Sequence, residues 1–345
     1  MSDELKAGGS RVNINDVALA AGVSTATVSR ALRNHPYVAE ATRQRILRVA
    51  EELRYVANAN AARLASGQSR TIGLLAPLLT SWYTSEVVAG VEEVLALAHF
   101  DLLIGTANPL ARERIFRGDA RFHQRTDGTM LVDVFCSEEG AQKLAELDIP
   151  VVVLGEQLRS VTSVSVDNER GARLAARHLM DLGHRRLAVV GGHAHLDVAH
   201  NVPTERLEGF RGALSSAGLR LPQQYVEDGD FTIEGGRRAM QRLLALPKPP
   251  SAVFLMSDEM AYGAMWALRD EGLQVGTDVS IVGFDDHPVA ESVGLTTVRQ
   301  PVREIGRIGA RLMLDALEGF GSVHHHPVEL TLVARATTGA PATHS

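Results

Sequence analysis

Short apolar runs alternate with amphipathic segments along most of this chain. The apolar runs lie at 72–75, 102–104, 129–132, 151–154, 187–190, 252–255 and 280–284. Apolar residues at helical spacing occur between most of them, at 86–98, 141–147, 169–182, 205–217, 234–246 and 258–271. Short buried strands alternating with helices are typical of parallel sheets covered on both faces. We therefore expect two doubly wound α/β lobes, with a small-molecule site at the carboxyl ends of their strands.

The first 70 residues follow a different pattern, with three short helical segments and no strand. The first helix is indicated by apolar residues at i, i+3, i+4 and i+7, namely Ile14, Val17, Ala18 and Ala21. Gly22 would end this helix, and Ser24 would cap a second helix that runs to about residue 34. A third helix is predicted over 39–54. This arrangement predicts a helix-turn-helix domain.

The charge of the chain changes together with this pattern. The formal net charge is −6, but residues 1–70 carry ten Lys and Arg against six Asp and Glu, and the remainder carries 25 against 35. A basic head on an acidic body is typical of a nucleic-acid-binding domain joined to a larger carrier. We therefore expect a disordered tail (1–10), a helix-turn-helix domain (11–57), a linker (58–69) and a body (70–345).

The second predicted helix carries the residues suited to reading DNA. Its N-terminal end would enter the major groove, where Arg30 could reach a guanine edge and Ala26 a thymine methyl group. Hydroxyl and guanidinium groups around it are suited to phosphates. The residues expected to contact DNA here are Ser24, Thr25, Ala26, Thr27, Ser29, Arg30 and Arg33.

Several ordered motifs resemble the lactose-repressor/galactose-repressor (LacI/GalR) family of bacterial transcription regulators. They include INDVALAAGVSTATVSRALRN, NANAARLASGQSRTIGLL, AVFLMSDEMAYGAMWAL and DVSIVGFDD. The resemblance implies a homodimeric repressor bound to a pseudo-palindromic DNA operator. It also implies a hinge helix at 58–65 that enters the minor groove, with Leu64 as an apolar wedge supported by Asn58, Asn60 and Arg63. Ala57 departs from the proline that the family commonly has there.

In this family the body resembles periplasmic sugar-binding proteins, with two lobes, three crossovers and a cleft. We place the crossovers near 166–168, 298–300 and 326–328. Lobe one then covers about 70–166 and 300–326, and lobe two about 167–298 and 328–340. The resemblance and the aromatic residues of one loop together suggest the effector-binding residues Trp82, Tyr83, Arg206, Phe231, Ser257, Asp258 and Asp285. We expect Trp82 and Tyr83 in the loop that follows the first strand of the body.

Carboxylate, guanidinium and aromatic groups together suit the hydroxylated and apolar faces of a sugar. A nucleobase or nucleoside effector remains open, as does whether the effector releases or promotes DNA binding. A sugar-acting enzyme is a weaker alternative, because no phosphate-binding loop or nucleophile elbow is present. A transport binding protein is another, but residues 1–10 do not resemble a secretory signal.

Other features of the sequence set limits. The single cysteine, Cys136, excludes an intrachain disulfide, and no stretch approaches the roughly 18 apolar residues of a membrane span. We expect no cofactor and no membrane partner. The histidines in 192–204 and at 324–326 are interpreted as solvated residues, not metal ligands. The expected location is the cytoplasm, in association with the nucleoid.

Overall fold

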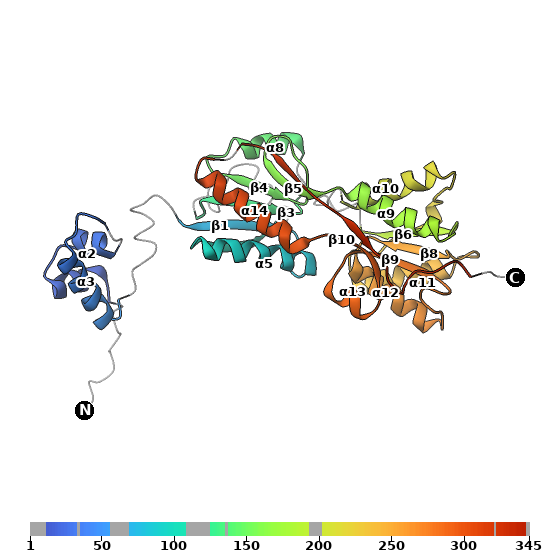
Figure 1. The fold of residues 1–345 in the computed structure, drawn as a ribbon, viewed down its shortest axis with the longest axis horizontal. Helices are drawn as coiled ribbons and strands as arrows, with labels where there is room; N and C mark the ends of the chain where they lie inside the picture. Colours follow the sequence, from blue (N-terminus) through green and yellow to red (C-terminus); the bar gives the residue numbers. More distant parts are fainter. Residues whose placement is uncertain are drawn as a thin grey trace, which may run out of the picture. The chain divides into compact units, whose positions relative to one another are not determined.

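The computed structural model describes residues 12–32, 35–55, 69–107, 125–134, 137–192, 202–320 and 322–342. These residues form two compact units, one within Met1–Arg70 and the other within Thr71–Ser345. Figure 1 shows the first unit in blue and the second in the remaining colours. No helix of the described part of the chain is long and apolar enough to cross a membrane.

The N-terminal unit contains three helices, α1 (Ile14–Ala21), α2 (Thr25–Leu32) and α3 (Glu40–Glu52). The Asn13 side chain caps α1 by accepting a hydrogen bond from the backbone N–H of Asn15, and Gly22 ends α1 with φ 63°. The three helices enclose a small core, whose buried members are Val17, Ala18, Ala21, Val28, Ala31, Val38, Ile46 and Ala50. The expected helix-turn-helix pattern is therefore present, with α1 at the expected bounds.

The second unit holds two six-stranded sheets. The first has the order β11-β5-β4-β3-β1-β2, and all its pairings are parallel. Its strands are β1 (Thr71–Ala76), β2 (Asp101–Thr106), β3 (Gly128–Val132), β4 (Val151–Leu154), β5 (Thr162–Val166) and β11 (His325–Val328). The second has the order β12-β10-β9-β8-β6-β7, in which only β12 is antiparallel to its neighbour. Its strands are β6 (Leu187–Gly191), β7 (Val226–Asp228), β8 (Ala252–Leu255), β9 (Ser280–Asp285), β10 (Thr296–Arg299) and β12 (Thr331–Val333).

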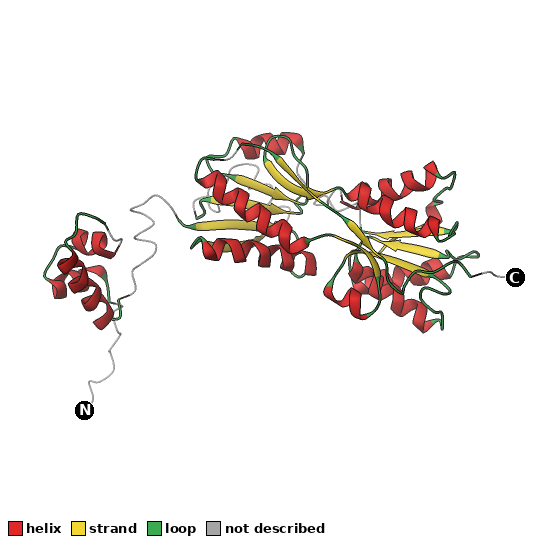
Figure 2. Ribbon diagram, in the orientation of Figure 1, coloured by secondary structure: helices red, strands yellow, loops and turns green. Residues whose placement is uncertain are grey.

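Helices cover both sheets, as the red ribbons around the yellow strands in Figure 2 show. The first lobe has α5 (Trp82–Leu97), α8 (Glu138–Ala145) and α14 (Val302–Leu317). The second lobe has α9 (Asn168–Asp181), α10 (Val202–Ser216), α11 (Ile233–Leu244), α12 (Asp258–Asp270) and α13 (Pro288–Ser292). This confirms the two-lobed α/β fold with doubly wound, mostly parallel sheets, joined to a helix-turn-helix headpiece.

The chain passes between the two sheets after β5, after β10 and after β11. The third passage, expected near 326–328, begins at the end of that range. His325 to Val328 pair in parallel with β5, so the first lobe continues to Val328 and the passage falls between Val328 and Thr331. The segment 325–328 reads His-His-Pro-Val, without alternation of apolar and polar residues, so the sequence did not mark this edge strand.

Helices α5 and α14 approach closely because glycines lie at their contact. A Cβ on Gly90 would stand 2.0 Å from the carbonyl oxygen of Arg303, and one on Gly306 would stand 2.2 Å from that of Val87. Arg303 also forms an ion pair with Glu86 at 2.9 Å, and Arg307 one with Glu93 at 2.7 Å. The two glycines thus allow α14 to pack closely against α5, and the ion pairs at the edge of the contact hold the helices together.

Candidate functional site

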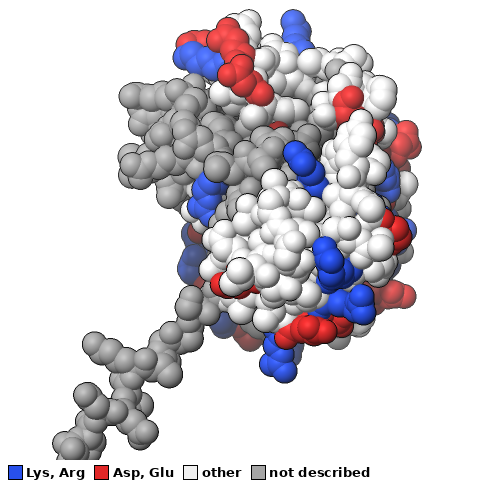
Figure 3. Space-filling view, turned by 90° about the vertical axis from the view of Figure 1, so that its left-hand side faces the viewer, with Lys and Arg blue, Asp and Glu red and all other residues white. Residues whose placement is uncertain are grey.

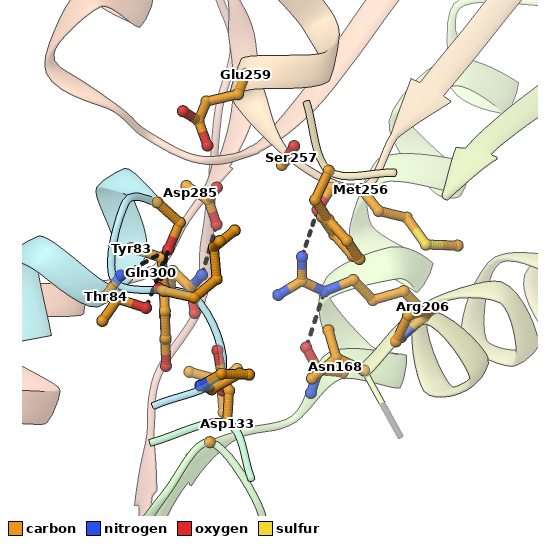
Figure 4. A pocket seen from close by; sticks show the side chains of 18 of the residues that line it. Tyr83, Thr84, Asp133, Asn168, Arg206, Met256, Ser257, Glu259, Asp285 and Gln300 are labelled. Atoms are coloured by element: carbon orange, nitrogen blue, oxygen red, sulfur yellow. Dashed lines mark hydrogen bonds between the residues drawn. The ribbon is translucent and has the colours of Figure 1, made fainter. Parts of the chain in front are cut away.

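A cavity of about 570 Å³ lies at the carboxyl ends of the strands, lined by residues of both lobes. Figure 4 shows its polar side chains surrounding a common space. The first lobe contributes Pro77, Leu78, Ser81, Tyr83, Thr84, Ala107, Asp133, Gly155 and Ile305, with Val166 and Gln300 at the passages. The second lobe contributes Asn168, Val202, Pro203, Arg206, Asp230, Phe231, Thr232, Met256, Ser257, Glu259 and Asp285. This is the location that the strand pattern predicts for a ligand.

Arg206 reaches the cavity from the first turns of α10 and is only 5% exposed. Its Nε donates to Asn168 Oδ1 at 2.9 Å, and its Nη1 donates to the carbonyl oxygen of Met256. Its Cζ atom lies 3.5 Å from the centroid of the Phe284 ring. Asn168 is itself fixed, since its Nδ2 donates to Glu205 at 2.9 Å. Burial lowers the pKa of Arg206, while Asp285 opposes this shift. The guanidinium is therefore a fixed cation directed into the cavity, as Figure 4 shows.

Asp285 ends β9 and is 8% exposed. Its Oδ1 accepts a hydrogen bond from Gln300 Nε2 at 2.6 Å. Burial raises the pKa of Asp285 to about 7, although Arg206 and the bond from Gln300 act to lower it. Its backbone has φ 124° and that of Asp286 has φ 58°, two left-handed conformations in succession. Strain of this kind is typical of ligand-binding turns that the surroundings hold in place.

Helix α12 begins with three polar residues that have different surroundings. The Ser257 hydroxyl caps the helix by accepting from the backbone N–H of Met260 at 3.3 Å, and both Ser257 and Glu259 line the cavity. Asp258 does not line it, contrary to expectation. Its fully buried carboxylate accepts hydrogen bonds from Thr297 Oγ1 at 2.6 Å and from the backbone N–H of His287 at 2.8 Å. Asp258 therefore anchors α12 to β10 and to the start of α13.

Trp82 and Tyr83 lie in the first turn of α5, not in the preceding loop as expected, because Ser81 caps the helix. Tyr83 lines the cavity, and burial raises its pKa well above the ordinary value. Trp82 does not line it. Its ring packs against that of His287, with centroids 4.8 Å apart, so it contacts the other lobe instead of the cavity.

Phe231 lines the cavity as expected, from the loop between β7 and α11. It has φ 50° and follows Asp230 with φ 52°, so the loop turns sharply at this position. A Cβ on Gly192 would stand 2.2 Å from the Phe231 ring, which shows that the glycine makes room for it.

The sequence-based interpretation missed several polar residues of the cavity, including Asp133, Asn168, Glu259 and Gln300. Asp133 directly follows β3, and Asn168 lies two residues after the end of β5, which is the signal that could have found them. The histidines at 193, 195 and 200 and the cysteine at 136 lie outside the described residues, while Val202–Thr204, expected in the same loop, belong to α10.

Helix α2 presents an exposed polar end. Thr25, Ala26 and Arg30 are exposed, and Thr27 and Ser29 are half-buried. Ser24 precedes the helix and accepts a hydrogen bond from the backbone N–H of Thr27 at 3.2 Å. Figure 3 shows basic side chains spread among uncharged and acidic ones on the face it views. The expected contacts Arg33, Asn58, Asn60, Arg63 and Leu64 lie outside the described residues.

Comparison with known proteins shows the family. Residues 13–58 match the bacterial regulatory proteins of the lacI family, and residues 176–338 match the periplasmic binding protein-like domain. The chain is 36% identical over 312 residues to the HTH-type transcriptional repressor CytR of Escherichia coli strain K12, covering 89% of this chain and 90% of that protein. The chain belongs to the LacI family. It is also 31% identical to catabolite control protein A of Priestia megaterium, over 88% of this chain and 91% of that protein.

Solved structures of LacI-family proteins share the fold. The lac repressor dimer bound to operator and the anti-inducer ONPF has a TM-score of 0.84 at 26% identity, with 96% of this chain and all of that chain covered. The complex of the transcriptional regulator CelR with cellobiose has a TM-score of 0.68 at 32% identity, with 95% and 100% covered. The protein is thus a LacI-family transcriptional regulator whose DNA binding is controlled by an effector. Members of this family are regulators, not enzymes.

Proposed function

We propose that the protein represses transcription as a homodimer on a pseudo-palindromic operator, and that a sugar bound in the cavity controls its affinity for DNA. Thr25, Ala26 and Arg30 of α2 would read bases, and Ser24, Thr27, Ser29 and Arg33 would support them. The hinge residues Asn58, Asn60, Arg63 and Leu64 would act in the minor groove. The protein would do this in the cytoplasm, on the nucleoid.

One observation carries the assignment of a sugar. Asp285 and Arg206 both reach the same cavity from different elements, the first after β9 and the second on α10. A carboxylate accepts hydrogen bonds and a guanidinium donates them, so together they suit a hydroxyl group, which does both. Tyr83 and Phe231 add aromatic surface for the apolar face of a ring. The cellobiose complex of CelR is a related example.

A nucleobase or nucleoside is the second candidate. Phe231 could stack on a base, and Asn168 and Gln300 could bind its edge. Both amides, however, already bond to neighbouring side chains, Asn168 to Glu205 and Arg206, and Gln300 to Asp285. To bind the edge of a base, the two amides would have to share or break these bonds. The hydroxyl groups of a sugar could instead bind beside the existing bonds.

Selection of DNA from a randomised library, followed by fluorescence anisotropy with the selected site, tests the regulator. We expect a two-fold symmetric site bound in a salt-dependent manner. Titration with neutral mono- and disaccharides and with nucleosides then tests the effector. A sugar that shifts the DNA affinity supports the proposal and gives the sign of control. A response to nucleosides alone would favour the second candidate, and failure to select any site would contradict specific DNA binding.

A further inference from the structure

The side chain of Asp133 enters the cavity from the first lobe. Asp133 directly follows β3, and it lines the cavity together with Arg206 and Asp285 of the second lobe. Figure 4 shows Asp133 and Asp285 on different sides of the space that Arg206 enters. A ligand that contacts Asp133 as well as Asp285 would therefore bridge the two lobes.

The backbone at Asp133 has a conformation that a residue with a side chain does not favour. Its φ is 49°, in the left-handed region that glycine adopts freely and that a residue with a Cβ adopts at a cost in free energy. The backbone N–H of Asp133 donates to the carbonyl oxygen of Leu154 at 2.9 Å, which ties the end of β3 to the end of β4. Glycine would satisfy this turn, so the turn does not account for the carboxylate. Strained residues of this kind cluster at ligand sites.

Gly155, the residue after β4, leaves open the space that this carboxylate occupies. It lines the cavity and has φ 104°. Its backbone N–H donates to the carbonyl oxygen of Val164 in β5 at 2.9 Å, so its own position is fixed. A Cβ at position 155 would collide with Oδ1 of Asp133. A side chain at position 155 and the observed position of the Asp133 carboxylate therefore exclude each other.

The charge of Asp133 acts on groups of both lobes. In the first lobe, burial and then the charge of Asp133 raise the pKa of Tyr83. In the second lobe, burial lowers the pKa of Arg206, while Asp285 and Asp133 oppose this shift. The carboxylate thus lies among the groups that would surround a ligand. A carboxylate has about four acceptor positions, so bonds to it within the protein are compatible with a further bond to a ligand hydroxyl.

We propose that Asp133 is an effector-binding residue of the first lobe, which accepts a hydrogen bond from a hydroxyl group of the effector, and that Gly155 is the positioning residue that makes room for it. The effector would then bind Arg206 and Asp285 of the second lobe and Asp133 of the first. Such a bridge stabilises one arrangement of the lobes over others. The inference rests on the proposed effector site, and it applies to a sugar and to the ribose of a nucleoside.

Isothermal titration of the full-length protein with ribose, glucose, galactose, mannose, cellobiose, adenosine and cytidine first identifies a compound that binds. Asp133→Gly then removes the carboxylate, and glycine adopts φ 49° without strain, so we expect the variant to fold. The affinity for that compound should fall at least about tenfold, because a hydrogen bond to a charged acceptor is lost. Asp133→Asn keeps one acceptor oxygen and should have an intermediate affinity. An unchanged affinity in Asp133→Gly would overturn the proposal.

His99→Gly is the matched control. His99 follows α5 in the first lobe, has φ 58° and is not among the described residues that line the cavity. The substitution makes the same change to the backbone and should leave the affinity unchanged. A loss as large as that in Asp133→Gly would assign the effect to the backbone of the first lobe and overturn the role of the carboxylate.

A double-mutant cycle tests the role of Gly155. Gly155→Ala alone should weaken effector binding, because its methyl group meets the Asp133 carboxylate. In the Asp133→Gly background that carboxylate is gone, and Gly155→Ala should change the affinity by less than about twofold. Strain at φ 104° lowers stability in both backgrounds, and thermal unfolding measures it separately from binding. Equal losses of affinity in the two backgrounds would overturn the positioning role of Gly155.

The outcomes also separate this inference from the proposed function. A sugar that binds the wild type and Asp133→Gly equally would overturn the inference and leave sugar sensing intact. Binding of nucleosides and of no sugar would contradict the sugar effector, while the variants would test Asp133 with that nucleoside. Binding of none of these compounds would contradict both, and the selected-DNA experiment would still decide whether the protein is a specific regulator.

Discussion

The indole ring of Trp82 packs against the imidazole ring of His287, with centroids 4.8 Å apart and planes inclined by 53°. Trp82 belongs to α5 of the first lobe, and His287 follows β9 of the second. The ring of Tyr262 on α12 lies on another side of the same imidazole, at 5.6 Å. The backbone N–H of His287 is held by Asp258. An aromatic contact near the cavity thus joins the two lobes.

Removal of the Trp82 ring is expected to weaken the coupling between effector and DNA. A ring contact between the lobes stabilises one arrangement of the two lobes relative to another. Coupling between effector and DNA binding requires such a difference in free energy between arrangements. Trp82→Ala should change the ratio of DNA affinities with and without effector by about fivefold, toward one. Trp82→Phe keeps a ring and should retain most of the coupling. Anisotropy titrations measure both, and equal coupling in Trp82→Ala and the wild type would count against the contact.

Protonation of His287 should be visible in the fluorescence of Trp82. Burial lowers the pKa of His287 below its ordinary 6.5, while Glu86 acts to raise it. The chain has two tryptophans, so Trp266→Phe leaves Trp82 as the one indole emitter. In that background, Trp82 emission should fall as the pH drops below 6.5, because a protonated imidazole quenches a neighbouring indole. Addition of His287→Asn should abolish the transition.

Asp285→Asn is expected to remove the loss of stability that Asp285 causes as the pH rises, while it impairs effector binding. The pKa of Asp285 is about 7 in the folded protein and 3.8 ordinarily, so the folded state binds the proton more tightly. Stability from this group is therefore present below pH 3.8 and is lost as the pH rises through about 7. Relative to the wild type, the variant should gain about 1–4 kcal/mol between pH 4 and pH 8. Urea unfolding at the two values measures this, and a gain that does not depend on pH would disprove the cause.

Gly90→Ala should destabilise the first lobe, because the new methyl group would meet the Arg303 carbonyl oxygen across the helix contact. A cost of about 1–3 kcal/mol is expected from overpacking. Gly212 in α10 is the matched control, because a Cβ there would meet nothing within 4 Å. Gly212→Ala should be neutral or stabilise by roughly 0.5–1 kcal/mol. Thermal unfolding of the two variants gives the comparison, and similar losses in both would rule out the steric explanation.

Arg30→Ala should weaken binding to the selected DNA site more than to random DNA. A bidentate contact of arginine with guanine contributes about 1–3 kcal/mol of discrimination. Arg45→Ala, on the exposed face of α3, should lower both affinities similarly or leave them unchanged. A loss of equal size on both DNAs for Arg30→Ala would assign Arg30 to the phosphate backbone instead of a base.

Much of the fold could be predicted because its signals are local. The bounds of α1 follow from Asn13 and Gly22, which cap the helix through their own chemistry. Helix α14 was missed although Val302, Ile305 and Met313 on its buried face lie at helical spacing. Strand β10 pairs with β9 and with β12, and β12 pairs with β10; such tertiary contacts leave little trace in the local pattern.

The cavity could be predicted only in part. Arg206 and Asp285 were found through the family resemblance, and both line it. Asp258 and Glu259 are adjacent acids at a helix start, and which one faces the ligand depends on the rotation of α12. That rotation is set by the bonds of Asp258 with Thr297 and His287, which come from distant parts of the chain. The residue expected to face the cavity, Asp258, is therefore the immediate neighbour of the residue that does face it, Glu259.

The start of α12 divides three tasks among three successive residues. Ser257 caps the helix, and Asp258 fixes it to β10 and to the start of α13. In the described part of the chain, Glu259 lines the cavity and supports no neighbouring element through a hydrogen bond. Position 259 is consequently the natural place to diversify when this regulator is adapted as a biosensor. Libraries at that position would explore new inducers while the scaffold that transmits their signal stays intact.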